Sequence, residues 1–421
     1  MRASTTVGRA KSKLFAGSHG QYGITVLTES MTERAYFDWN ATAPLRTEAR
    51  EAMTAALGLT GNASSVHLEG RVARQTIEQA RARVAALVGA EPKNVTFTSG
   101  ATEANMLALT PALEAGGRKE PLDRLFVSAI EHPSVRSGGR FSAGAVEQVP
   151  VDGDGVVDLE ALKAALARVE RPLVSVMLAN NETGVIQPIA AIADIVHAAN
   201  GLLHVDAAQG AGRIDCDIAA LGADLISLSS HKLGGPQGAG ALVRRDGIHI
   251  AEPLIRGGGQ ERNLRAGTEN VAAIAGFGAA AEAANSARQA DAIRMAALRD
   301  RFEAALLAQT PSAVIFGAMA PRLPNTSLFA VPGLKAETAI ISFDLNGIAV
   351  SSGAACSSGK VQTSTVLTAM TVESGLAAGA VRVSLGWSTT QADIDLLLTA
   401  WMRVVSSLLK GQELKGAARA A

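Results

Sequence analysis

A lysine and an aspartate follow two apolar stretches of strand length, and their types and spacing are the first to suggest chemistry. One stretch breaks into Ser229–Lys232, which a glycine-rich turn follows, and the other ends at Asp206. A spacer of helix length separates them, so parallel strands would bring Asp206 and Lys232 to the same edge of a sheet. Ligands of α/β sheets collect at that edge, and an amine beside hydroxyls and glycines suits a bulky anionic ligand.

Pyridoxal phosphate (PLP) is one ligand with these requirements, because it binds a lysine as a Schiff base and its pyridinium nitrogen takes an acidic partner. Lys232 would supply the amine and Asp206 the acid. A solvated loop position is the ordinary environment of a single lysine. The presence of Asp206, His231 and the glycines around Lys232 favours the cofactor over that alternative.

A second candidate anion site lies where a predicted strand, Val95–Thr98, passes into a predicted helix that opens at Ala101 and Thr102. The free N–H groups of a helix start attract anions, and Thr102 adds a hydroxyl. An ordinary capped helix start explains the same residues equally well. Two nucleotide patterns lack support: GxxxxGK[ST] is absent, and the GxGxxA match at Gly276–Ala281 lies in an alanine-rich segment that follows no clear strand.

The composition is typical of a globular α/β enzyme. Of 421 residues, 48% are hydrophobic and 19% are charged, and this length predicts two or three domains. Lys plus Arg and Asp plus Glu number 39 each, so no net charge recruits nucleic acid or an anionic membrane. The apolar runs are too short to cross a bilayer. Two distant cysteines, Cys216 and Cys356, argue against a disulfide scaffold or a cysteine metal site and fit a reducing compartment.

Strands that alternate with helix-length segments predict an α/β fold with a mainly parallel, doubly wound sheet. The expected helices include 47–57, 69–88, 189–199 and 391–409, the last of them capped by Thr390 and Asp393. Polar residues gather at the predicted strand ends: Thr102, His132, Asn181, Asp206, Gln209, His231 and Lys232. Each alone fits an ordinary turn, and their shared topological position is what indicates a site.

The predicted organisation has two domains and two flanking segments. Residues 46–290 form a large PLP-binding domain. Residues 35–45 together with 291–408 form a smaller α+β C-terminal domain, which carries the Cys356 loop, and residues 409–421 form a tail.

Residues 1–34 are interpreted as an N-terminal extension, either disordered or the product of a mis-assigned start, because Met31 directly precedes the first ordered pattern. The segment is basic, has no acid before Glu29 and lacks the apolar core of a secretory signal, while its composition also fits an organellar transit peptide. The predicted location is the cytoplasm, or an organellar matrix if residues 1–30 are such a peptide.

A series of motifs in one order resembles the class V aminotransferase-like PLP enzymes, and within them the cysteine desulfurases of the NifS/IscS-like type. The likeness covers nearly all of residues 35–408. It rests on the motifs 38–42, 61–67, 98–103, 131–132, 180–184, 204–209, 229–232, 257–262, 265–268, 351–358 and 382–386. The resemblance implies the PLP-dependent transferase fold type I.

The resemblance also implies a role for each matching residue. Lys232 would bind the cofactor and move the Cα proton, Asp206 would pair with the pyridine nitrogen, and His132 would stack on the ring and shuttle protons. Asn181 and Gln209 would contact the ring oxygen.

The phosphate and the substrate would be held by further residues that match the family. The phosphate would sit on Ala101, Thr102, Ser229 and His231. Thr268 of a neighbouring subunit would complete that site, so the resemblance implies a homodimer. Asn40, Asn181 and Arg382 would bind the substrate, and the Arg382 guanidinium would clamp its carboxylate. No metal is expected.

The reaction implied is the conversion of L-cysteine to L-alanine, with the Cys356 thiolate attacking the substrate sulfur to give a persulfide. Cys356 lies in a Gly/Ser/Ala loop unlike a core, whereas Cys216 suits a small buried hydrophobe. The sulfur would pass to an acceptor protein such as an iron–sulfur scaffold, for cluster or thio-cofactor biosynthesis.

Two alternatives stay open. Another class V PLP enzyme, a C–S lyase, epimerase or aminotransferase, would use the same cofactor site but needs no thiol at position 356. A degenerate PLP fold acting as a scaffold would not need Lys232, Asp206 and His132. Departures from the usual family residues, at Ala63, Ser364–Leu367 and Thr371, leave the identity of the sulfur acceptor open.

Overall fold

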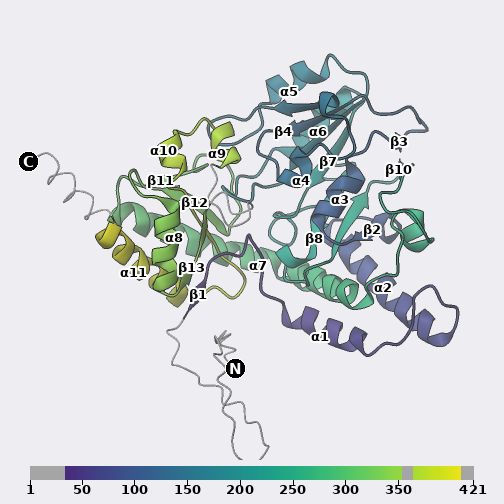
Figure 1. The fold of residues 1–421 in the computed structure, drawn as a ribbon, viewed down its shortest axis with the longest axis horizontal. Coiled ribbons are helices and arrows are strands. Elements are labelled where there is room, and N and C mark those ends of the chain that lie inside the picture. Colours follow the sequence, from purple (N-terminus) through teal and green to yellow (C-terminus); the bar gives the residue numbers. More distant parts are fainter. Residues whose placement is uncertain (1–33, 353–363, 409–421) are drawn as a thin grey trace, which may run out of the picture.

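A seven-stranded sheet forms the centre of the larger part of the chain (Figure 1). The structure, a computed structural model, describes residues 34–352 and 364–408. In spatial order the strands are β2 (Val95–Thr98), β9 (Gly240–Arg244), β8 (Leu225–Ser229), β7 (Leu202–Asp206), β6 (Pro172–Met177), β4 (Arg124–Ser128) and β5 (Val146–Val149). All run parallel except β9, which is antiparallel to both neighbours, so the prediction of a mainly parallel sheet is confirmed.

Helices cover both faces of this sheet, because neighbouring residues of one strand point to opposite faces. On one face, Leu203 and Val205 of β7 join a core with α2 (Leu68–Leu87), α5 (Leu159–Leu166) and α6 (Ile189–Ala198). On the other face, Leu202 of β7 packs in a second core with α3 (Ala101–Ala108) and α4 (Pro133–Arg136). A sheet buried on both faces accounts for strands such as β6, in which every residue is buried.

A four-stranded antiparallel sheet organises the smaller part. Its order is β11 (Val314–Ile315), β12 (Thr326–Ala330), β15 (Val381–Ser384) and β14 (Ser351–Ser352). The helices α8 (Ala336–Leu345) and α11 (Gln391–Leu408) pack on it around the buried Trp401. The N-terminal β1 (Ala35–Tyr36) pairs in parallel with β13 (Ile348–Ala349) and so joins this part.

One helix, α7 (Val271–Gln309), contributes to the cores of both parts (Figure 1). Its residue Phe277 belongs to the core of the large sheet, and Phe302 to the core of the small sheet. The domain boundary expected at residue 290 falls inside α7.

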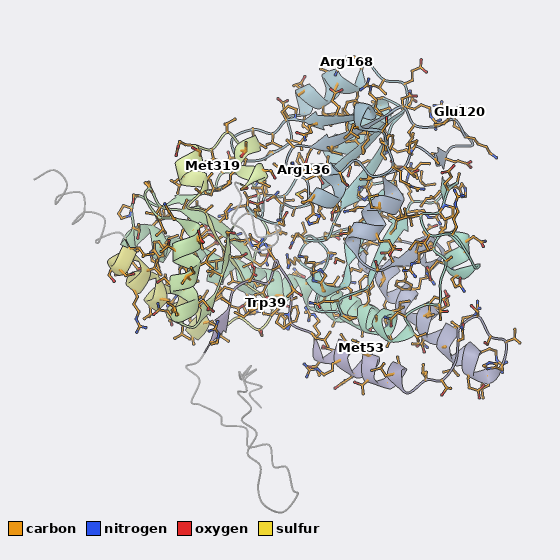
Figure 2. The ribbon with its side chains drawn as sticks, viewed as in Figure 1. Trp39, Met53, Glu120, Arg136, Arg168 and Met319 are labelled. Atoms are coloured by element: carbon orange, nitrogen blue, oxygen red, sulfur yellow. The ribbon has the colours of Figure 1, made fainter. Side chains whose placement is uncertain are left out.

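The GxGxxA match lies inside α7, as expected of a segment that is not a dinucleotide site. A Cβ on Gly276 would lie 2.5 Å from Met53 of α1 (Thr47–Leu57), which Figure 2 labels, and one on Gly278 would lie 2.5 Å from Ala80 of α2. These glycines let α7 approach α1 and α2 closely.

The remaining elements are short. They are β3 (Leu113–Ala115) paired with β10 (Ile248–Ile250), α9 (Thr365–Ala369), α10 (Ser374–Ala377), and the 3₁₀ turns η1 (Pro92–Asn94), η2 (Ala143–Ala145), η3 (Ser230–Lys232) and η4 (Gln260–Asn263).

Most helix predictions agree with the structure within a residue. Asp393 accepts from Thr390 N at 2.7 Å and from its hydroxyl at 2.8 Å, which confirms the predicted cap of α11.

The described residues contain no helix that is long and apolar enough to cross a membrane. Residues 1–33 of the predicted extension 1–34 lie outside the described residues, as do the predicted tail 409–421 and Cys356.

Candidate active site

A cavity of about 650 Å³ lies where β7 and β8 end, beside the start of α3. Eleven of the predicted site residues line it: Asn40, Ala101, Thr102, His132, Asn181, Asp206, Gln209, Ser229, His231, Lys232 and Arg382. Two predicted residues do not. Thr268 is exposed and does not line the cavity of its own chain, and Cys356 lies outside the described residues.

Lys232 ends the 3₁₀ turn that follows β8, as the sequence predicted for a residue at a strand end. Its Nζ donates to the backbone oxygens of Asn40, at 2.5 Å, and Ala41, at 2.8 Å. The turn continues through Gly234, whose φ of +91° is unfavourable for other residues and whose added Cβ would lie 2.4 Å from the Trp387 ring. This close packing fixes the backbone from which Lys232 enters the cavity.

Asp206, Asn105, Ser134 and His132 form one hydrogen-bonded chain, named here the acidic network. Asn105 Nδ2 donates to Asp206 Oδ2 at 2.8 Å and to Ser134 Oγ at 2.9 Å. Ser134 Oγ lies 2.8 Å from His132 Nδ1. The other oxygen of Asp206 accepts from the backbone N–H of Ala208 at 3.0 Å. The acidic network thus joins Asp206, the predicted acid, to His132, the predicted ring-stacking residue.

Burial keeps His132 neutral on the wall of the cavity. It lowers the pKa of His132 below its ordinary value, Asp206 opposes this effect and Lys232 adds to it. Glu131, the preceding residue, is fully buried, and burial raises the pKa of its carboxyl to about 8 although Ser128 and Met177 donate to it. Glu131 therefore presents a neutral carboxyl beside His132 near neutral pH.

Arg213, Asn40, Gln209 and Lys232 form a second assembly, named here the arginine network. Arg213 NH1 donates to Asn40 Oδ1 at 3.0 Å and to Gln209 Oε1 at 2.5 Å, and its NH2 donates to the backbone oxygen of Lys232 at 3.4 Å. Gln209 Nε2 in turn donates to the backbone oxygen of Asn40 at 3.0 Å. Three loops far apart in sequence are thereby tied together behind the cavity.

The guanidinium of Arg213 is buried and forms no salt bridge to a carboxylate within residues 34–352 and 364–408. Burial, together with a smaller effect of the nearby Arg382, lowers its pKa to about 9. Arg213 remains charged at neutral pH, and only neutral oxygens of those residues surround it.

The start of α3 offers an open cradle for an anion. Gly100 forms the N-cap of α3 without a side-chain hydrogen bond, and a Cβ added there would meet nothing within 4 Å. Gly240 of β9 passes so close that an added Cβ would lie 2.6 Å from the Gly100 backbone. Thr102 and His231 line the cavity, and burial lowers the pKa of His231 to about 4.

Arg382 of β15 brings the smaller part of the chain to the cavity. Its NH2 lies 2.7 Å from Asp38 Oδ1, and its NH1 donates to the backbone oxygen of Asn181 at 2.9 Å. Its Nε is buried without a partner among the described residues. Figure 2 labels Trp39, next to Asp38, where the chain passes between the two sheets beside α7.

Sequence reasoning did not single out Ser134, which lines the cavity, or Asn105 and Arg213, which lie behind it. Asn105 could have been found as a polar residue in the helix 101–108 among alanines, methionine and leucine, because such a position is costly without a hydrogen-bond partner. Arg213 could have been found as an arginine four residues after Gln209. Ser134 follows a proline turn and carries no comparable signal.

These residues fit PLP. An amine, an acid, an imidazole and an open helix start share one cavity, and Arg382 Nε is an orphaned donor. The donor set is that of an anion site rather than a metal site, and no cluster of His, Cys, Asp or Glu able to hold a metal occurs in the described part of the chain.

Comparison with known proteins agrees with this geometry. Residues 35–397 match the family Aminotransferase class-V. A cysteine desulfurase of Cereibacter sphaeroides is 44% identical over 384 residues, covering 89% of this chain and 97% of the relative. The cysteine desulfurase IscS of Dictyoglomus turgidum is 39% identical over 382 residues, covering 90% of this chain and 96% of the relative.

The fold agrees as well. The solved structure of a NifS-like protein from Rickettsia africae is similar with a TM-score of 0.80 at 35% identity, and the match covers 89% of this chain and 99% of that chain. The matched regions include both sheets and every described residue that lines the cavity. The chain therefore belongs to the class V aminotransferase family, whose cofactor is PLP, and within it to the cysteine desulfurases.

Proposed function

We propose that the cavity carries out the desulfuration of L-cysteine to L-alanine, with Cys356 as the sulfur acceptor. The observation that carries this proposal is the meeting of Lys232, Asp206 and Arg382 at one cavity, although they come from different strands of two sheets. The residue roles below extend the family assignment to individual side chains.

Several residues would hold PLP. The Lys232 amine would bind it covalently, Asp206 would pair with its pyridine nitrogen, and Asn181 and Gln209 would contact its ring oxygen. Its phosphate would lie at the start of α3, held by Ala101, Thr102, Ser229 and His231. When bound, the cofactor withdraws electrons from the substrate Cα and so lowers the cost of removing its proton.

Arg382 would bind the substrate carboxylate. Its unpartnered Nε supports this role, because a guanidinium presents donors in a fork that matches a carboxylate. Asp38 now occupies NH2, so the substrate would share or replace that contact. The amide of Asn40 is bonded to Thr326 and Arg213, which leaves it to shape the substrate pocket around Arg382.

Lys232 would move the Cα proton, since its amine enters the cavity from a fixed turn. The Cys356 thiolate would then attack the substrate sulfur. The new S–S bond forms as the C–S bond breaks with its electron pair going to carbon, which takes up a proton. The products are L-alanine and a persulfide on Cys356.

A homodimer and an acceptor protein are part of the proposal. Thr268 is exposed and would complete the phosphate site of the neighbouring subunit. A neighbouring subunit would also offer cover to large apolar side chains that are exposed in the single chain, among them Val66, Leu68, Leu254 and Ile255. The Cys356 persulfide would pass to an acceptor such as an iron–sulfur scaffold, in the cytoplasm.

A product assay tests the proposal. Purified holoenzyme is incubated with L-cysteine and a thiol reductant, and alanine, sulfide, pyruvate and ammonia are measured. Equal amounts of alanine and sulfide are expected, and Cys356→Ala should abolish both while the visible absorbance of the cofactor remains. Cys216→Ala is the matched control, because Cys216 is buried and its pKa is raised to about 12 by burial. Pyruvate and ammonia, or turnover that does not need Cys356, would instead identify a C–S lyase.

A further inference from the structure

The hydrogen bonds of the His132 ring have a fixed direction. His132 immediately precedes α4, and its Nδ1 lies 3.2 Å from the backbone nitrogen of Ser134 and 2.8 Å from Ser134 Oγ. A backbone N–H can only donate, so Nδ1 must accept and carries no proton. The neutral ring therefore holds its proton on Nε2.

Asn105 orients the Ser134 hydroxyl in the same sense. The Asp206 carboxylate accepts and cannot donate, so the Asn105 amide must turn its NH₂ group toward it. The second N–H of that nitrogen meets Ser134 Oγ. The hydroxyl hydrogen of Ser134 is then free to point at His132 Nδ1, and every bond from His132 back to Asp206 has a defined donor.

We propose that Asn105 and Ser134 are positioning residues that fix His132 as its Nε2–H tautomer, so that the ring offers a hydrogen-bond donor to the ligand of the cavity. Nε2 forms no hydrogen bond to another residue in the described part of the chain. An amide N–H does not release its proton at neutral pH, so the acidic network cannot carry a proton from Asp206 to His132. His132 holds an acceptor atom of the ligand, and the Cα proton is moved by Lys232 alone.

The inference replaces the proton-shuttle role that the family resemblance implies for His132, and it rests on the proposed function for the identity of the ligand. The charges that face His132 are Asp206 at the end of β7 and Lys232 in η3, and Glu131 beside it is bonded to Ser128 and Met177. The donors to Nδ1 and the burial of the ring both disfavour the imidazolium. In that form Nδ1 would carry a proton, which would face the proton of the Ser134 N–H.

Ring-nitrogen NMR tests the inference directly. The holoenzyme is labelled with ¹⁵N-histidine, its seven histidines are recorded between about pH 6 and 9, and His132→Gln assigns the signal. We expect a protonated Nε2 and an unprotonated Nδ1 throughout. A proton on Nδ1 of the wild-type ring at neutral pH, in either the other tautomer or the imidazolium, would overturn the proposal.

Two variants at Ser134 separate positioning from general structure. Ser134→Ala removes a donor to Nδ1 without touching Asp206, so protonated Nδ1 should become detectable toward pH 6, whereas Ser134→Thr keeps the hydroxyl and should behave as wild type. Asn105→Leu should shift the ring in the same direction as Ser134→Ala. A Ser134→Ala titration identical to wild type would contradict the inference.

His204 serves as the internal control for folding. Its ring lies buried between Ser175 Oγ, at 2.8 Å, and Ser227 Oγ, at 2.9 Å, so its signals should not change in any of these variants. The two proposals fail separately. If the His132 signals are as expected but no alanine forms, the proposed reaction is wrong and the tautomer stands. If alanine forms normally but Nδ1 is protonated, the tautomer is wrong and the proposed reaction stands.

Discussion

The two networks on the walls of the cavity differ in where the charge lies. In the acidic network the charge sits at one end, on Asp206, and neutral groups with defined donors lead from it to His132. In the arginine network the charge sits at the centre, on Arg213, and neutral oxygens surround it. The first arrangement fixes protonation states, and the second fixes the positions of three loops.

A buried ion pair elsewhere in the chain shows what is unusual about Arg213. Arg81 donates to both oxygens of Glu261, at 2.7 and 2.8 Å, so its charge is neutralised within the protein. Arg213 has no such carboxylate among the described residues, and a buried charge without an opposite partner is costly. Its positive field reaches the cavity, where an anionic cofactor and substrate would compensate it.

Removing Lys232 should have the largest effect, because its amine would both bind the cofactor and move the Cα proton. Lys232→Ala should lose the visible absorbance of the cofactor and reduce turnover by at least the roughly 10²–10⁴-fold typical of a missing acid–base group. Absorbance spectra and alanine formation measure this. Lys163→Ala, an exposed lysine of α5, is the control, and near-normal turnover of Lys232→Ala would remove the central residue of the proposed site.

Removing the charge of the acidic network comes next. Asp206→Asn is neutral and keeps a single oxygen, which can replace the acceptor of Asn105 or that of Ala208 but not both, so the pyridine nitrogen would lose its acidic partner. We expect a fall in kcat of about 10²-fold or more with the cofactor still bound. If kcat were unchanged, the charge at this wall would not matter and the contrast between the two networks would disappear.

Removing the charge of the arginine network should act through position. Arg213→Met leaves Asn40 Oδ1 and Gln209 Oε1 without their donor, at a cost of about 1–3 kcal/mol for each unpaired group. The loosened loops should lower kcat/KM by about 10²-fold, since a displacement near 1 Å costs that much. Arg213→Lys keeps the charge but loses the fork, so it should recover cofactor affinity more than kcat. Equal defects in both variants would show that geometry, not charge, is the contribution of Arg213.

The smallest effect concerns stability and pH at Glu131. Its pKa of about 8 lies above the ordinary 4.5, so the folded state favours the protonated form. This contribution is complete below about pH 4.5 and is lost as the pH rises toward 8, by about 1.4 kcal/mol for each pKa unit as an upper limit.

Glu131→Gln should remove that pH dependence. Urea unfolding of the holoenzyme at several pH values between 4.5 and 8 measures it, and the stability of the variant relative to wild type should increase with pH. Parallel curves would mean that Glu131 ionises in the folded protein as it does in the unfolded chain, and that Asp206 is not the only charged acid of its wall.

Strand-end residues were predictable because the period of apolar residues defines strands and helices locally. The stretches before Asp206 and Lys232 read as strands and are β7 and β8, and the free start predicted at Ala101 is the start of α3. The place of Arg382 at the same cavity followed only from the family resemblance, because a lone charge in a short strand has no local signature. The continuity of α7 through residue 290 was missed, because its alanine-rich first half has no periodicity that marks a boundary.

The sequence by itself determined the element order, the mainly parallel sheet and the polar strand-end residues of the cavity, since these follow from local pattern and from motifs near strand ends. Only the tertiary structure decided which polar and charged groups hold these residues in place. Asn105 reaches Asp206 across 101 positions and Arg213 reaches Asn40 across 173, and no pattern along the chain records such partners. Burial supplies the reason, because a polar group removed from water must find its hydrogen bonds wherever the fold places them.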